Sequence, residues 1–272
     1  MPDAANTRIA VLIDADNTSA NHASALLDEV ARYGVPTVKR AYGDWTTQQL
    51  VSWKKELNRH AIQPVQQFAY TTGKNSTDSA LIIDAMDLLY SGNLEAFAIV
   101  SSDSDFTRLA TRLRESGKTV YGLGTRRTPA SLVAACDKFI YLEVLGDDDP
   151  TDDPEPGDRD DIDDSDSEGG PRLPDLRRLL TTAINRTSHE DGWANLGSVG
   201  SYLSTSNASF DPRNYGFAKL VNLARAQDYL DVDHDTGNAP KVRLKAGRPT
   251  KKSPQKTAEK KAAPAKKSAR KR

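Results

Sequence analysis

The chain has 272 residues, enough for one large domain or two small ones, and its hydrophobic share of 37% is low for a fully packed protein. Its formal net charge is only −1, which excludes a uniformly basic or acidic protein, but residues 147–168 are strongly acidic and residues 245–272 strongly basic. The single cysteine, Cys136, excludes an internal disulfide framework, and no apolar run approaches the roughly 20 residues of a membrane span. No export signal is evident, so a cytoplasmic location is expected.

Short apolar runs alternate with amphipathic segments over residues 1–146. The expected strands are 9–13, 35–42, 62–68, 96–100, 119–123 and 138–144. The expected helices are 24–33, 46–60, 77–90, 106–116 and 131–136. Strands that alternate with helices of about 10–15 residues are typical of parallel βαβ units. The sequence therefore predicts a three-layer α/β domain with a parallel sheet over residues 1–146.

The second half of the chain divides into an acidic run, a folded segment and a basic tail. Residues 147–171 contain too little apolar area to order themselves and are predicted to be a disordered linker. Within 172–246, helices are expected near 176–184, 193–204 and 215–227, followed by a hairpin of 230–232 with 242–244. Three helices and a hairpin are typical of a small winged-helix domain. Residues 247–272 are of low complexity and predict a disordered basic tail.

Carboxylates follow two of the predicted strands directly. Asp14 and Asp16 end the first strand, and Asp103 and Asp105 follow the strand at 96–100. Because the carboxyl ends of parallel strands meet at one edge of a sheet, where such sheets bind ligands, we expect these acids to lie close together. Asp78 begins the helix expected at 77–90. Taken alone, an aspartate there is as often a helix cap as a ligand.

A group of carboxylates at one edge predicts a cation. The charges repel, and each raises the pKa of its neighbours unless a positive charge neutralises them. Oxygen ligands suit Mg²⁺ or Mn²⁺, and the absence of histidine or cysteine near these acids argues against zinc. Such an ion activates water and stabilises charge that develops on a phosphoryl group. The predicted cofactor is Mg²⁺ or Mn²⁺.

Three motifs of this domain closely resemble the NYN domains, PIN-like nucleases related to the bacterial LabA-type proteins. They are IDADN at 13–17, TDSALIIDA at 77–85 and SSDSDF at 101–106, and the YGDW segment at 42–45 falls within the same resemblance. The resemblance implies a metal-dependent ribonuclease fold. Its implied catalytic and metal-binding residues are Asp14, Asp78, Asp103 and Asp105, with Asn17 assisting at the strand end.

Three further residues near these motifs have less direct roles. Asp84 falls in the family pattern but lies about 240° around the helix from Asp78, so we expect it to have a supporting or structural role. The side chain of Asp16 is expected to face away from Asp14. Lys74 is a candidate phosphate contact, and a solvated loop lysine is the ordinary alternative.

The first motif also fits a different enzyme class. Asp14, Asp16 and Thr18 match the DxDxT signature of haloacid-dehalogenase-like phosphatases, in which Asp14 would be the nucleophile and Asp16 the acid/base. No later lysine and acidic pair completes that site, and Asp78 would have no role. The phosphatase is therefore the weaker hypothesis.

Residues 173–244 resemble the LOTUS (OST-HTH) domain, most specifically in Gly192–Trp193, Phe210–Arg213 and Tyr215–Gly216. That family is associated with RNA binding and, in some members, with protein partners. The candidate RNA contacts of this domain are Arg213, Lys219, Arg225, Lys241 and Arg243. Scattered bases of this kind are also ordinary on a protein surface. The basic tail would bind any polyanion by counterion release, or else cover the acidic linker.

Together these observations predict a cytoplasmic, Mg²⁺- or Mn²⁺-dependent endoribonuclease with RNA as its partner and no membrane association. The competing hypothesis is a non-catalytic RNA-binding adaptor that keeps the acidic pocket without turnover. Both predict RNA binding, so only cleavage distinguishes them.

Overall fold

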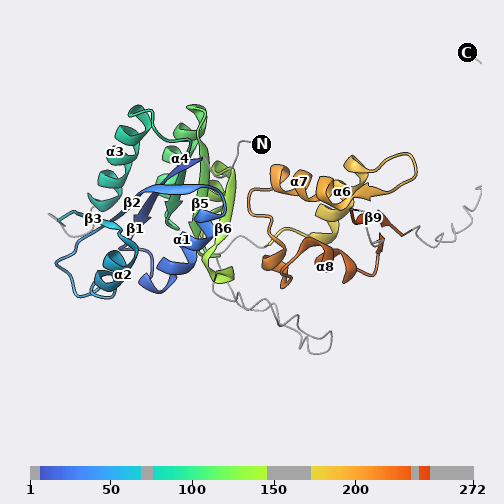
Figure 1. Ribbon diagram of the computed structural model, residues 1–272, viewed down its shortest axis with the longest axis horizontal. Helices are drawn as coiled ribbons and strands as arrows, with labels where there is room; N and C mark the ends of the chain where they lie inside the picture. The colour runs from blue at the N-terminus through green and yellow to red at the C-terminus, as the bar shows by residue number, and fades with distance from the viewer. Residues whose placement is uncertain (1–6, 69–75, 146–172, 234–238, 246–272) are drawn as a thin grey trace, which may run out of the picture.

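The computed structural model describes residues 7–68, 76–145, 173–233 and 239–245, which form two domains side by side (Figure 1). Lys74, the linker expected at 147–171 and the tail expected at 247–272 lie outside the described residues. None of the helices in the described residues is both long enough and apolar enough to cross a membrane.

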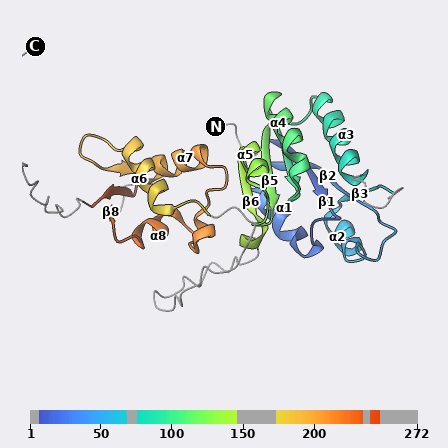
Figure 2. The ribbon, with the colours of Figure 1, turned by 180° about the vertical axis from the view of Figure 1, so that it is seen from behind.

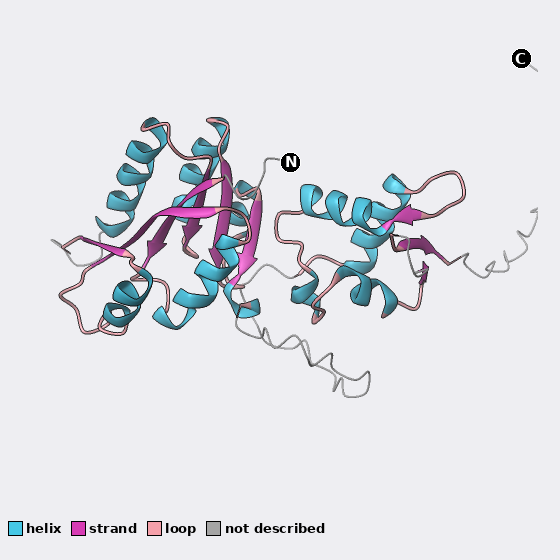
Figure 3. Cartoon of the chain, in the orientation of Figure 1, coloured by secondary structure: helices cyan, strands magenta, loops and turns pink. Residues whose placement is uncertain are grey.

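The first domain is built on one six-stranded parallel sheet (Figure 3). Its strands are β1 (Arg8–Asp14), β2 (Val35–Gly43), β3 (Gln63–Gln66), β4 (Ala96–Val100), β5 (Thr119–Gly124) and β6 (Lys138–Tyr141). They lie in the order β3-β2-β1-β4-β5-β6, so β1 and β4 are neighbours although they are far apart in the sequence. The predicted parallel α/β sheet is confirmed.

Helices cover both faces of this sheet, as two views of the molecule show (Figures 1 and 2). They are α1 (Ala23–Ala31), α2 (Trp53–His60), α3 (Ser76–Tyr90), α4 (Thr107–Glu115) and α5 (Ala130–Ala135). Successive β1 side chains point to opposite faces. Ile9, Val11 and Ile13 pack with α1 and α2, whereas Ala10 and Leu12 pack with α3 and α4. The three predicted layers are therefore present.

Three predicted elements of the first domain are too long. The strand expected at 62–68 is only Gln63–Gln66. The helix expected at 46–60 begins only at Trp53, because the Asp44 carboxylate accepts hydrogen bonds from the backbone N–H of Thr46 (3.1 Å) and from its hydroxyl (2.6 Å) and holds a turn. The strand expected at 138–144 ends at Tyr141 and continues as a 3₁₀ turn, Leu142–Val144.

The second domain contains the predicted helices and hairpin. Its elements are α6 (Leu176–Thr187), β7 (Ala194–Asn195), α7 (Leu196–Ser206), α8 (Leu220–Arg225), β8 (Leu230–Asp233) and β9 (Lys241–Leu244). The strands form an antiparallel sheet in the order β7-β9-β8. The helix expected at 215–227 is shorter than predicted, because Gly216 adopts a left-handed conformation (φ 80°) after the 3₁₀ turn Pro212–Tyr215.

A polar network fixes α3 on β2. The Asp84 carboxylate on α3 accepts hydrogen bonds from the Arg40 guanidinium and from the Tyr42 hydroxyl, and both donors come from β2. Burial, followed by the Asp84 carboxylate, raises the pKa of Tyr42, so the phenol stays protonated and continues to donate. Asp84 therefore has the expected structural role, and it fixes the position of α3, the helix that carries Asp78.

We expect Asp84→Ala to lower the free energy of unfolding of the first domain by about 2 kcal/mol, because the buried Tyr42 hydroxyl and the half-buried Arg40 guanidinium lose a charged acceptor. Urea unfolding monitored by circular dichroism measures the change. Asp87→Ala is the matched control, since Asp87 is exposed on the same helix. Equal losses in the two variants would contradict the role of the network.

Candidate active site

The acidic residues converge because β1 and β4 are paired in parallel. Ile13 lies opposite Val100 in the ladder, so Asp14 and Ser101, the next residues on each strand, meet at the carboxyl edge. The Ser101 hydroxyl donates to Asp14 Oδ2 (2.9 Å) and accepts the backbone N–H of Asp103 (3.1 Å). This serine therefore joins the end of β1 to the loop after β4.

Asp14 is the deepest acid of the group and is fully buried. Its carboxylate also accepts hydrogen bonds from Asn17, at 2.8 Å from the side-chain amide and 3.3 Å from the backbone N–H. Burial raises the pKa of Asp14, and the hydrogen bonds from Asn17 and Ser101 only partly offset it. Asn17 thus hydrogen-bonds Asp14 at the end of β1, and its part in catalysis stays a prediction.

Three other carboxylates form a compact cluster beside Asp14. One oxygen from each of Asp78, Asp103 and Asp105 lies within 4.8 Å of the others. Asp78 is buried, Asp103 is half-buried and Asp105 is exposed, so the cluster opens to solvent on one side. Asp103 also accepts the backbone N–H of Asp105 (2.9 Å), which fixes the short loop between them.

Asp78 is affected by both burial and the neighbouring carboxylates. Burial, then the charges of Asp14, Asp103, Asp105 and Asp16, raise the pKa of Asp78 to about 6. The first helical turn of α3 therefore does not stabilise this aspartate enough to offset its neighbours. A site of this kind gains from a cation, because a positive charge would remove the repulsion that the fold imposes.

Asp16 lies at the same site, although the sequence suggested that it faces away from Asp14. Its carboxylate accepts a hydrogen bond from the Thr77 hydroxyl (2.9 Å), so it sits beside the start of α3. Sequence reasoning missed Thr77 and Ser101, the two hydroxyl residues of the site. Their positions inside the motifs at 77–85 and 101–106 were the available signal.

The donor set fits a hard divalent ion. Asp78, Asp103 and Asp105 offer only carboxylate oxygens, and their spacing lets one ion contact all three. Among the described residues, no histidine or cysteine belongs to the cluster. Mg²⁺ and Mn²⁺ match these ligands, whereas zinc sites usually include nitrogen or sulfur.

Residues 8–143, the whole of this sheet and its acidic edge, match the NYN domain family. The chain belongs to the NYN domain family. Residues 172–242 match the OST-HTH/LOTUS domain. The NYN domain places the first half of the chain among PIN-like nucleases, which generally use divalent metals, and the OST-HTH domain indicates RNA binding. The NYN match argues against the phosphatase hypothesis, which left Asp78 without a role.

Several solved structures are similar to parts of the chain. A protein of unknown function from Vibrio parahaemolyticus is 17% identical, covers 51% of this chain and 94% of its own, and has a TM-score of 0.43. A protein fragment from Chromobacterium violaceum is 35% identical, with 26% and 82% coverage and a TM-score of 0.23. An uncharacterised protein from Nitrosomonas europaea is 28% identical, with 34% and 95% coverage and a TM-score of 0.25. No curated protein matches the chain.

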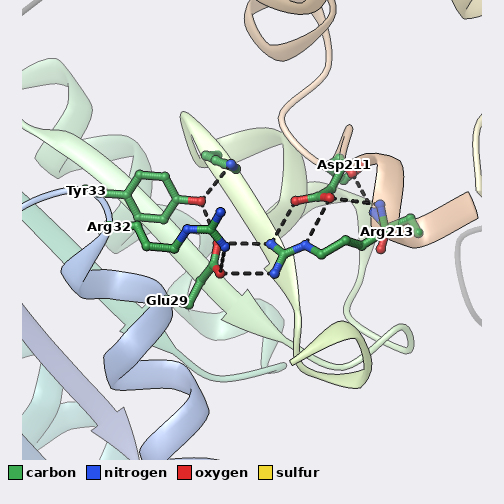
Figure 4. Close-up of polar contacts among 8 residues, drawn as sticks. Glu29, Arg32, Tyr33, Asp211 and Arg213 are labelled. Atoms are coloured by element: carbon green, nitrogen blue, oxygen red, sulfur yellow. Dashed lines mark hydrogen bonds and ion pairs between the residues drawn. The ribbon is translucent and has the colours of Figure 1, made fainter. Parts of the chain in front are cut away.

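A buried ion-pair network joins the NYN domain to the OST-HTH domain (Figure 4). The Arg213 guanidinium donates to both oxygens of Glu29 on α1 (3.0 and 3.1 Å) and also to Asp211. Glu29, only 3% exposed, additionally accepts from the Tyr33 hydroxyl (2.6 Å) and from Arg32 (3.1 Å). Burial opposes the charge of Glu29, but the hydrogen bonds from Arg213 and Tyr33 outweigh it and lower its pKa.

The other predicted RNA contacts are distributed differently. Lys219, Arg225 and Lys241 are exposed on the OST-HTH domain. Arg243 is also exposed, but it pairs with Asp231 (3.1 Å) and lies 4.6 Å from the Trp193 ring centre. The donors of Arg213 are occupied by carboxylates in the network described above, so this residue joins the two domains instead of facing solvent.

We expect Asp78→Asn to raise the melting temperature of the metal-free protein, and to raise it more as the pH increases. A carboxyl whose pKa rises on folding, here from 3.8 to about 6, weakens the folded state progressively between those values. Melting in EDTA from about pH 4 to about pH 7 measures the difference between variant and wild type. Asp87→Asn, on the exposed face of α3, should show no such trend. A difference independent of pH would contradict the repulsion.

We expect Glu29→Gln to release the OST-HTH domain from the NYN domain, because the half-buried Arg213 would lose its charged acceptor on the NYN domain and keep only Asp211 of its own domain. Small-angle scattering should show a larger radius of gyration than wild type. Since the pKa of Glu29 is lowered, the wild-type contact should persist above the ordinary value near 4.5 and be lost only as the pH falls below it. Asp28→Asn, exposed on the same helix, is the control, and an unchanged radius in Glu29→Gln would refute the contact.

Proposed function

We propose that the protein is a Mg²⁺- or Mn²⁺-dependent endoribonuclease that uses its OST-HTH domain to hold RNA. The observation that supports this most directly is the cluster of Asp78, Asp103 and Asp105 beside buried Asp14. These carboxylates repel one another, and a shared cation best explains why they lie so close together. A NYN domain and an OST-HTH domain in one chain give that cation a nuclease context and give RNA a binding surface.

Each residue of the site has a distinct proposed task. The ion is held by Asp78, Asp103 and Asp105, and Asp14 completes the ligand set from the buried side of the site. Asn17 and Ser101 orient the Asp14 carboxylate and partly offset the effect of its burial through hydrogen bonds of 2.8 and 2.9 Å. When bound, Mg²⁺ or Mn²⁺ supplies an activated water and charge compensation for the phosphodiester. Asp105, the exposed member, lies on the side from which a phosphate can approach.

RNA recognition is assigned to the exposed cations of the OST-HTH domain, Lys219, Arg225 and Lys241, with a contribution from Arg243. Basic side chains on a folded surface can discriminate among RNA shapes, whereas charge alone adds affinity without selectivity. Lys74, outside the described residues, remains a proposed phosphate contact. Arg213 has the different role of joining the two domains.

We expect Asp14→Asn and Asp103→Asn each to reduce RNA cleavage at least about a hundredfold, because each change removes a charged ligand while leaving a nearly isosteric side chain. Cleavage of a pool of labelled RNAs and DNAs, with Mg²⁺, with Mn²⁺ and with EDTA, measures the effect. Asp87→Asn is the control, and all variants must melt within the wild-type range in EDTA or above it.

Two outcomes would overturn the proposal. Wild-type rates in both site variants would remove the carboxylates from catalysis. A wild-type protein that binds RNA but cleaves no member of the pool with either metal would favour the non-catalytic adaptor. Cleavage of RNA but not of DNA would establish the ribonuclease.

A further inference from the structure

A rigid loop lies next to the acidic cluster and carries two adjacent arginines. It spans residues 125–129, between β5 and α5. The Thr125 backbone N–H donates to the Ser102 hydroxyl (2.9 Å), and the two hydroxyls are 3.1 Å apart. Asp103 is the residue after Ser102, and Arg126 is the residue after Thr125. The contact between Ser102 and Thr125 therefore brings the arginine pair close to the acidic loop.

The backbone of this loop is fixed while its cations are exposed. The Thr128 hydroxyl and backbone N–H both donate to Thr125 O (2.7 and 3.0 Å). The backbone N–H of Arg126 donates to Glu143 Oε1 (2.8 Å). Both arginine side chains are exposed, and neither forms an ion pair with another described residue. Thus two guanidinium groups are presented to solvent by a loop that needs no rearrangement to do so.

The negative charge at this edge would repel RNA unless cationic side chains lie nearby. The site carries five carboxylates, those of Asp14, Asp16, Asp78, Asp103 and Asp105, and the neighbouring edge loops add Asp44 and Glu143. One divalent ion offsets only two of the five charges, so the edge stays negative toward a polyanion. In the parts of the edge loops that the structure describes, 15–19, 44–52, 101–106, 125–129 and 142–145, the cationic side chains are Arg126 and Arg127.

The arginine pair also lies on the side from which bound RNA would arrive. The acids sit on β1, β4 and α3, β5 is the next strand, and β6 is the outermost. The OST-HTH domain contacts β6, where the Phe139 N–H donates to Ala208 O (2.8 Å), and Figure 1 shows that domain beyond β6. The contact lies at the start of β6, so an RNA strand held by the OST-HTH domain would pass β6 and β5 to reach the acidic edge, where the loop at 125–129 follows β5.

We propose that Arg126 and Arg127 bind backbone phosphates of the RNA adjacent to the cleaved bond, on the side facing the OST-HTH domain. This inference rests on the proposed ribonuclease function and names the contact that brings a polyanion to an acidic site. Guanidinium groups suit the task because they can bind two phosphate oxygens at once. They hold the substrate and take no part in bond breaking.

The test compares Arg126→Gln/Arg127→Gln with Arg59→Gln/Arg112→Gln in the full chain. Arg59 and Arg112 are exposed, and each forms a long ion pair of 3.8 Å, to which Arg112 adds a hydrogen bond with Tyr90. Both lie near the C-terminal ends of α2 and α4, toward the other edge of the sheet. Binding of a labelled single-stranded RNA is measured against salt, with every variant also carrying Asp14→Asn so that cleavage does not interfere. We expect about a tenfold loss for the first pair and a salt slope smaller by about 1.4.

Three further measurements separate a phosphate contact from a structural effect. Arg126→Lys/Arg127→Lys should recover most of the affinity, because it keeps the charge, and all variants should melt alike. In the otherwise wild-type site, the glutamine pair should raise KM and leave kcat nearly unchanged. RNAs with a single neutral methylphosphonate should lose affinity at one or two positions, and those positions should lose nothing further with the glutamine pair.

Equal losses in the two glutamine pairs, or additive losses at every methylphosphonate, would overturn the inference. Because binding is measured without turnover, the two proposals fail separately. A wild-type chain that cleaves nothing, together with a selective loss for the 126–127 pair, would keep the phosphate contact and reject the nuclease. RNA cleavage without a selective loss of affinity for the 126–127 pair would keep the nuclease and reject the phosphate contact.

Discussion

Repulsion between carboxylates at one sheet edge is the constraint around which this molecule is arranged. Parallel pairing of β1 with β4 puts Asp14 beside the loop that carries Asp103 and Asp105, and α3 adds Asp78. The fold stabilises this arrangement with groups that do not belong to the cluster. Ser101 and Asn17 donate to Asp14, and the contact of Asp84 with β2 keeps α3 in place. The structure thus tolerates a local electrostatic repulsion that a bound cation would remove.

The sequence predicted much of the fold because burial is expressed directly in it. Five consecutive apolar residues before Asp14 can be a buried parallel strand, and the same logic found the strand before Ser101. The errors fell where short-range polar contacts compete with helix formation. Asp44 holds a turn that delays α2, and Gly216 ends a 3₁₀ turn before α8 can begin. The first turn depends on one side chain and the second on the backbone conformation of one glycine, and both leave the apolar pattern unchanged.

The site was harder to predict than the fold. Strand ends placed Asp14, Asp103 and Asp105 at one edge, but only tertiary structure shows that Asp16 turns toward Thr77 and that Arg213 turns toward Glu29. Both outcomes are set by partners from remote parts of the chain, 61 and 184 residues away. From the sequence, an arginine in a nucleic-acid-binding domain is predicted to contact phosphate, and only the structure shows that its partner is a carboxylate.

The hydrogen bond from Phe139 to Ala208 has a consequence for solubility. β6 is an outer strand, and outer strands offer unpaired backbone groups to which a second molecule can add a strand. The opposite outer strand, β3, has only four residues and contains Pro64, which gives it little capacity for such addition. On the β6 side the protection comes from the other domain. An NYN domain separated from its OST-HTH partner would expose that strand, and self-association through it would accompany the separation.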